Sequence, residues 1–240
     1  MSGMSLGMKL EDFLLNAEVM IGNALSDPEM KAGLSNFGYT EVKLAAGKQL
    51  FDEADALVKK QKVEYGEQIE ATKLLDDVWE AADSAFMKTL KVARVAFQGN
   101  VKAYRALMLV EKRKGSLSGW LEQAGNFYDN ILGDADLIQA MGNFNYTREK
   151  LAAERDNIAI VREKNIKQNK ETGEAQDATK KRDAKLDELA GWLSDLKAIA
   201  RVAFEEEPQK LEKLGILVLN APRAKKKAAA SSTSSASASA

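Results

Sequence analysis

The chain has 240 residues, of which 30% are charged and 7% aromatic, with a formal net charge of −1 and only 3 prolines. It contains no cysteine and no histidine, which excludes thiol nucleophiles, disulfides, zinc centres built on these ligands and the usual general base near neutral pH. The abundance of Ala, Leu, Lys and Glu is typical of long helices.

The N-terminal segment has no basic stretch followed by an apolar run, and Glu11 and Asp12 interrupt its apolar residues. No window approaches the roughly 18–20 apolar residues that a membrane-spanning helix needs. We therefore expect no signal peptide, no membrane span and a cytoplasmic location. Residues 1–222 carry a net charge of −5, because the four basic residues beyond them offset it to −1. This acidic body argues against nucleic-acid binding by it.

The first predicted element is an amphipathic helix over residues 9–25, with apolar residues every three or four positions. Asp27 and Pro28 then predict the start of a short second helix, as N-cap and first helical residue. A turn follows at residues 36–38, where Gly38 supplies the positive φ that a helix C-cap requires.

Three segments recur at one spacing of 107 residues. NFGYTEVKLAAG at 36–47 returns at 143–154, GEQIEATK at 66–73 returns at 173–180, and ARVAF at 93–97 returns at 200–204. Over these 25 aligned positions 18 are identical, which indicates a tandem duplication. We predict helical repeats at 8–112 and 116–219 that intertwine as one domain, with Asn145 taking the place of Gly38.

A heptad pattern of the coiled-coil type runs from Thr40 to about Phe97 and from Thr147 to about Phe204. It continues without a change of phase through Gly66 and Gly173, although a lone interior glycine costs about 1 kcal/mol relative to alanine. We predict one very long helix in each half, at about 40–97 and 147–204. The alternative is a break at each glycine, which would give four shorter helices.

The middle of each long helix is polar and contains small residues. Close crossing of the two helices at this point is one interpretation, and a tolerated hinge in a solvated helix is the other. The helix-crossing or interaction candidates are Gly66, Gly173, Ala71, Ala178, Gln61, Gln168, Thr72 and Thr179.

The same region carries repeated carboxylates. Glu64, Glu67 and Glu70 recur as Glu171, Glu174 and Asp177, and their spacing places each set roughly along one helix face. Together with the Gln and Thr side chains they would form an oxygen-only cation site. The interpretation we favour is a solvated face paired with neighbouring lysines, so we predict no metal and no cofactor.

Residues 221–240 are Ala/Ser-rich with a basic start and have no large apolar side chain to bury, which predicts a disordered tail. The tail serves best as a solubilising or linker segment. Its few positive charges would give only weak, salt-sensitive binding to nucleic acid or acidic membranes.

The blocks NFGYT…KLAAG, EYGEQ, ARVAF and EKLGI resemble an uncharacterised prokaryotic family of all-helical, tandem-duplicated proteins. The resemblance covers most of residues 10–217. It implies the helical fold and no known activity, cofactor or partner.

The sequence therefore predicts an all-α fold, an elongated pseudo-two-fold bundle in which short helices cluster at the ends of two long ones. We expect no enzymatic activity and predict a structural or protein-interaction scaffold whose partner is protein, a homo-oligomer or another chain. A membrane-active protein of the α-helical pore-forming type and a carboxylate-based metal-binding protein or hydrolase are the alternatives. No phosphate-binding loop or nucleophile motif supports an enzyme.

Overall fold

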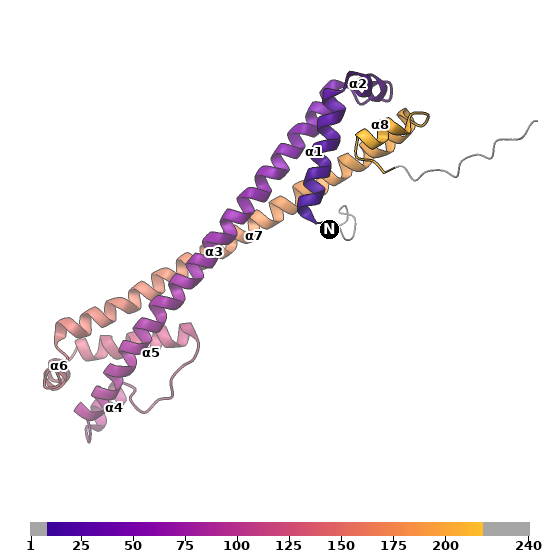
Figure 1. Cartoon of the computed structure of the whole chain (residues 1–240). Helices are drawn as coiled ribbons and strands as arrows, with labels where there is room; N and C mark the ends of the chain where they lie inside the picture. The colour runs from indigo at the N-terminus through magenta and orange to yellow at the C-terminus, as the bar shows by residue number, and fades with distance from the viewer. Residues whose placement is uncertain (1–8, 218–240) are drawn as a thin grey trace, which may run out of the picture. The chain divides into compact units, whose positions relative to one another are not determined.

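A computed structural model describes residues 9–217, and the regular structure of this range is entirely α-helical (Figure 1). The predicted tail at 221–240 lies outside the described residues. In chain order the helices are α1 (Leu10–Ser26), α2 (Pro28–Ser35), α3 (Glu41–Ala96), α4 (Val101–Ala106), α5 (Leu117–Leu132), α6 (Ala135–Gly142), α7 (Arg148–Ala203) and α8 (Pro208–Lys213).

The prediction of two very long helices is confirmed. α3 and α7 each have 56 residues and run without interruption through Gly66 and Gly173. The alternative of four shorter helices is therefore wrong. α2, α3 and α4 begin and end 107 residues before α6, α7 and α8, respectively.

The chain divides into two compact units, and each contains parts of both long helices. Unit 1 consists of described residues 9–52 and 187–217, so it holds α1, α2, α8, the start of α3 and the end of α7. Unit 2 is the continuous stretch from residue 53 to residue 186, with α4, α5 and α6. The boundaries of the units thus fall inside α3 and α7 rather than between the halves of the sequence.

The short helices begin where the sequence supplies an N-cap. The Asp27 carboxylate accepts hydrogen bonds from the backbone N–H groups of Glu29 and Met30 at 2.9 and 3.3 Å. Asp134 does the same at the start of α6. Each cap satisfies two of the N–H groups that a helix start leaves without a partner.

The turns after α2 and α6 have the predicted left-handed residue. Gly38 has φ of 82° and Asn145 has φ of 60°. The next N–H, from Tyr39 or Tyr146, reaches back to the carbonyl of Leu34 or Met141. This Schellman-type pattern ends the short helix and reverses the chain into the long one.

Aromatic side chains dominate the core of unit 2. Phe86 of α3 makes edge contacts with Trp120 and Phe127 of α5, at centroid distances of 6.3 and 5.4 Å. Tyr128 lies against the same ring at 5.9 Å. Leu151, Ile158 and Val161 of α7 belong to the same buried cluster, so α5 is held between the two long helices.

Unit 1 is built around a different contact between α3 and α7. Gly47 faces the Trp192 ring so closely that an added Cβ would lie 2.2 Å from it. Tyr39 packs edge-on against the same indole at 5.8 Å. A glycine is therefore required at position 47, because the indole occupies the space of a side chain.

The equivalent place in unit 2 has the opposite distribution of volume. Position 154, which is 107 residues after Gly47, is glutamate, and Ala85 stands 107 residues before Trp192. The Glu154 carboxylate accepts hydrogen bonds from Thr89 at 2.5 Å and from Tyr128 at 2.8 Å. The two units thus fill corresponding space with an indole in one case and a buried polar network in the other.

The heptad pattern is wrong by one residue at the middle of the long helices. Tyr65, predicted to point inward, is exposed, while Glu64 is partly buried and Ala71 is buried in place of Thr72. An α-helix has about 3.6 residues per turn, so its inward face drifts by about 20° per heptad. Over four heptads from Leu44 this drift approaches the 100° that separates adjacent residues.

Replacing Tyr128 with phenylalanine should change how stability depends on alkaline pH. Burial and the adjacent Glu154 carboxylate raise the pKa of Tyr128 well above its ordinary value. Above about pH 10 the unfolded chain then releases this proton while the native chain keeps it, so native stability falls by up to about 1.4 kcal/mol per pH unit. We expect urea-denaturation curves at pH 9–11.5 to show a shallower decline for Tyr128→Phe. Parallel declines would contradict the assignment, and Tyr65→Phe, at an exposed position, is the control.

Candidate functional site

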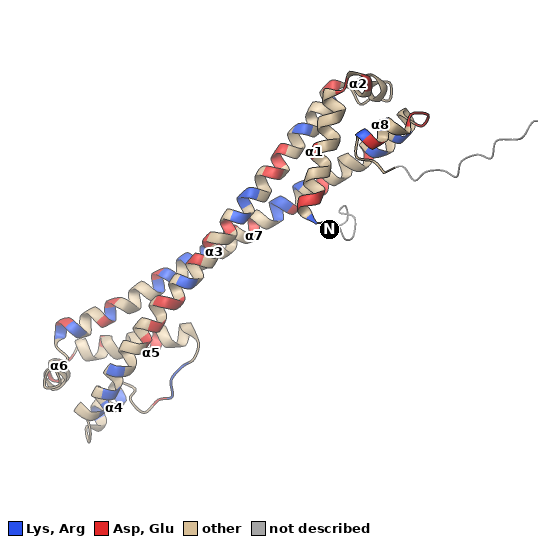
Figure 2. Cartoon of the chain, viewed as in Figure 1, with Lys and Arg blue, Asp and Glu red and all other residues tan. Residues whose placement is uncertain are grey.

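The polar waist, defined as residues 61–72 of α3 and 168–183 of α7, contains all eight sequence candidates and lies in unit 2. Here the two helices run antiparallel, since Glu53 pairs with Lys185 and Thr89 bonds to Glu154. Charges of both signs alternate along this part of α3 and α7 (Figure 2).

The two glycines do not mark a close approach. Gly66 and Gly173 are exposed, and a Cβ added to either would meet no heavy atom within 4 Å. The small buried residues of the waist are instead Ala71 and Ala178, which are 4% and 5% exposed. The prediction that these glycines let the backbones approach is therefore corrected: they lie on the solvent side of continuous helices.

The Thr candidates are satisfied within their own helices. The hydroxyls of Thr72 and Thr179 donate to the carbonyls four residues earlier, both at 2.9 Å. Gln168 donates to the hydroxyl of Thr172 at 3.1 Å. These side chains are only partly buried, and their bonds follow the helix rather than converge on a common point.

One Gln candidate joins the two helices. Gln61 of α3 accepts a hydrogen bond at 3.1 Å from Arg182 of α7. Arg182 also donates to Asp183 beside it, at 2.6 Å. With the Lys185–Glu53 pair at 3.0 Å, this contact fixes the register of α7 against α3 at one end of the waist.

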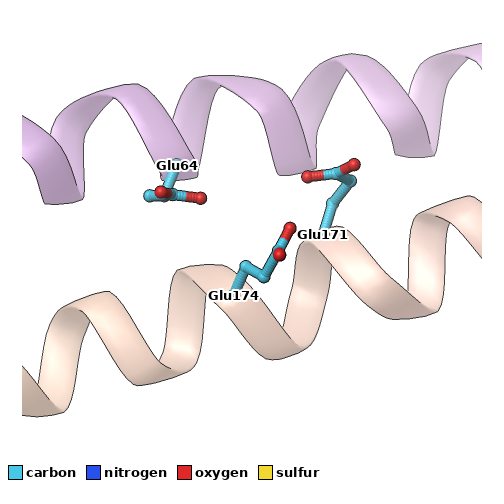
Figure 3. A group of neighbouring side chains, drawn as sticks. All are labelled: Glu64, Glu171 and Glu174. Atoms are coloured by element: carbon cyan, nitrogen blue, oxygen red, sulfur yellow. The ribbon is translucent and has the colours of Figure 1, made fainter.

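Three carboxylates from the two helices converge in the waist (Figure 3). Glu64 of α3 and Glu171 and Glu174 of α7 each offer one oxygen, and these oxygens lie within 4.8 Å of one another. We call these residues the carboxylate cluster. Glu67 and Glu70, which the sequence grouped with Glu64, are exposed and stay outside it.

The three members of the carboxylate cluster differ in their surroundings. Glu64 lies 3.8 Å from Lys60, and Glu174 lies 3.4 Å from Lys170. Glu171 is only 8% exposed, and within residues 9–217 no hydrogen bond or ion pair involves its carboxylate. Lys170 acts on it electrostatically without a direct bond.

A cavity of about 290 Å³ adjoins the carboxylate cluster. Glu64 and Glu174 form part of its wall, together with Leu57, Lys60, Asp177, Ala178 and Lys181. None of the described buried side-chain oxygens is both sealed from solvent and without a partner. The cluster is therefore accessible from solvent, and its chemistry is that of oxygen ligands with a net negative charge.

A second cavity, of about 270 Å³, lies at the other end of unit 2, beside Trp79. Its acidic residue Asp83 already accepts hydrogen bonds from Trp120 at 2.7 Å and from Arg113. These bonds hold the segment after α4 against α3, so we assign Asp83 a structural role.

Within residues 9–217 no helix is both long enough and apolar enough to cross a membrane. Comparison of the chain with protein-family models, with curated protein sequences and with solved structures finds no match. The argument for function therefore rests on the residues of this chain.

Alanine at Gly66 or Gly173 should stabilise the protein, each by about 0.5–1 kcal/mol, because alanine is the better helix former and the added methyl group meets open space. Gly47→Ala, in the same helix as Gly66, should destabilise by about 1–3 kcal/mol, because the methyl group would displace the Trp192 ring. Urea denaturation followed by circular dichroism measures both signs. A destabilising Gly66→Ala would restore the close-crossing interpretation.

Glu171→Gln should raise the unfolding free energy by about 0.5–1 kcal/mol in the presence of a chelator, since it removes one of three neighbouring like charges. Glu67→Gln, at an exposed position on the facing helix, should change stability by less than about 0.5 kcal/mol. Thermal melts in EDTA compare the two variants. A loss of stability in Glu171→Gln would mean that neighbouring lysines already satisfy the cluster.

Proposed function

We propose that this protein is a non-enzymatic interaction scaffold that assembles with copies of itself. The observation that carries the proposal is a set of matched exposed apolar side chains. Phe37 and Phe144 are each 45% exposed, and Val95 and Val202 are 59% and 57% exposed. The members of each pair are identical residues 107 positions apart, and a role in the core does not account for them.

Each unit carries one member of each pair, at one end. In unit 1, an added Cβ on Gly33 of α2 would lie 2.5 Å from the Phe204 ring. The turn after α2, which bears Phe37, therefore lies at the same end as Val202, two residues before Phe204.

Unit 2 has the corresponding arrangement. Phe97 belongs to its buried cluster, and Ala140 of α6 packs against that cluster. Val95 precedes Phe97 by two residues, and Phe144 follows α6 directly, so both lie at this end. A third pair, Val110 and Leu217, is also exposed, with one member in each unit.

Two equivalent apolar surfaces on one chain support self-association with two contacts per molecule. Exposed apolar patches mark protein–protein contacts more often than isolated apolar residues do. A net charge near zero, here −1, reduces the repulsion between copies. If each surface pairs with its equivalent on another copy, association continues from molecule to molecule. The 107-residue spacing supports the tandem-repeat interpretation on which this equivalence rests.

Serine substitutions test the proposal by counting the surfaces that remain. We expect the wild-type chain to form oligomers that grow with concentration in light scattering coupled to size-exclusion chromatography. Val95→Ser or Val202→Ser, each leaving one intact surface, should stop at dimers. The double variant should be monomeric.

The chain offers a matched control in Val63. This valine lies on the same helix as Val95 and has the same exposure, 59%, but Lys170 stands 107 residues after it. Val63→Ser should therefore assemble as the wild type does. A wild type that remains monomeric at all concentrations, or an equal effect of Val63→Ser, would contradict the proposal.

A further inference from the structure

We propose that Glu64, Glu171 and Glu174 bind a calcium-sized divalent cation that joins α3 to α7 at the polar waist. The ligands come from both helices, Glu64 from α3 and the other two from successive turns of α7 (Figure 3). A bound ion would therefore bridge the helices where apolar contacts are fewest.

The state of Glu171 distinguishes this cluster from an ordinary acidic surface. Its side chain is more than nine-tenths buried, with 8% exposure, and it points into the space between the helices toward the other two carboxylates (Figure 3). Among the described residues no donor forms a hydrogen bond or ion pair with it. Burying a carboxylate without a partner is costly, and a cation at this point would supply the missing charge.

The distances fit a large ion better than a small one. Calcium binds oxygen at about 2.3–2.6 Å, so two oxygens on one ion lie at most about 5 Å apart. The three carboxylate oxygens meet this limit, since they lie within 4.8 Å of one another. Magnesium binds at about 2.0–2.1 Å, which limits the separation to about 4 Å and requires the helices or side chains to move.

The charges around the site also permit binding. Lys60 and Lys170 lie within 4 Å of Glu64 and Glu174, so the three carboxylates keep one net negative charge. Both lysines are more than half exposed and would swing into solvent when a cation enters. The adjoining cavity gives an entry path and room for the waters that complete the coordination shell.

This ligand set predicts modest affinity. Sites with few carboxylates and little preorganisation bind calcium with dissociation constants of about 10⁻⁴–10⁻³ M. Competition from the two lysines acts in the same direction. Calcium binding at the waist does not require self-association, because all three ligands belong to one chain.

The test is a calcium titration of the full chain after EDTA treatment and dialysis, followed by thermal melts and isothermal calorimetry at constant ionic strength. We expect the melting temperature to rise by several degrees in 10 mM CaCl₂, which exceeds the expected dissociation constant about tenfold or more. An equal concentration of MgCl₂ should give a smaller shift. A wild type that shows no shift beyond the sodium chloride control would overturn the proposal.

Two variants locate the site. Glu171→Gln should lose most of the calcium-dependent shift and bind at least about tenfold more weakly, since ligand charge sets calcium affinity. Glu67→Gln, which stands at the position equivalent to Glu174 but outside the carboxylate cluster, should respond as the wild type does. Glu64→Gln provides a second test should Glu171→Gln fail to fold by circular dichroism. An unchanged response in the folded Glu171→Gln or Glu64→Gln variant, or an equal loss in Glu67→Gln, would overturn the placement.

Discussion

The antiparallel packing of α3 against α7 is the constraint on which the rest of the structure depends. A helix of 56 residues is stable in water mainly because its apolar face is covered. Short helices cover that face only near the termini of α3 and α7, so each long helix contributes to two cores. In the waist the helices have only each other, and alanines, an Arg–Gln bond and ion pairs replace the large apolar side chains.

The two cores show how related sequences reach equal packing by different means. In unit 1 the missing side chain at Gly47 admits the Trp192 ring. In unit 2 the volume lies on the other helix, where Glu154 accepts from Thr89 and Tyr128. Dense interiors tolerate exchanges that conserve volume, and a buried carboxylate requires its donors to be present as well. Substitution at any one of these positions without the others would leave a void, a clash or an unpaired charge.

Much of this fold is predictable because its signals are local. The caps at Asp27 and Asp134, the positive φ at Gly38 and Asn145, and the uninterrupted apolar spacing through Gly66 each depend on residues within a few positions. The carboxylate cluster was only half predictable. Spacing groups Glu64 with Glu67, but which of them faces α7 depends on the drift of the helical face and on the register between the helices. The exchange of Gly47 for Glu154 is likewise visible in the sequence, whereas its cause is a ring 145 residues away.

The discontinuity of unit 1 has a consequence for the order in which the chain acquires its structure. Unit 2 is one unbroken stretch, so all of its contacts are available once residue 186 has left the ribosome. Unit 1 joins segments that are far apart, as in the hydrogen bond from Asn23 to the Lys213 carbonyl across 190 positions. Because domains fold as units during synthesis, α1 and α2 are made first but complete their core last. Their apolar faces therefore stay without native partners through most of translation, an interval in which chaperone binding would protect them.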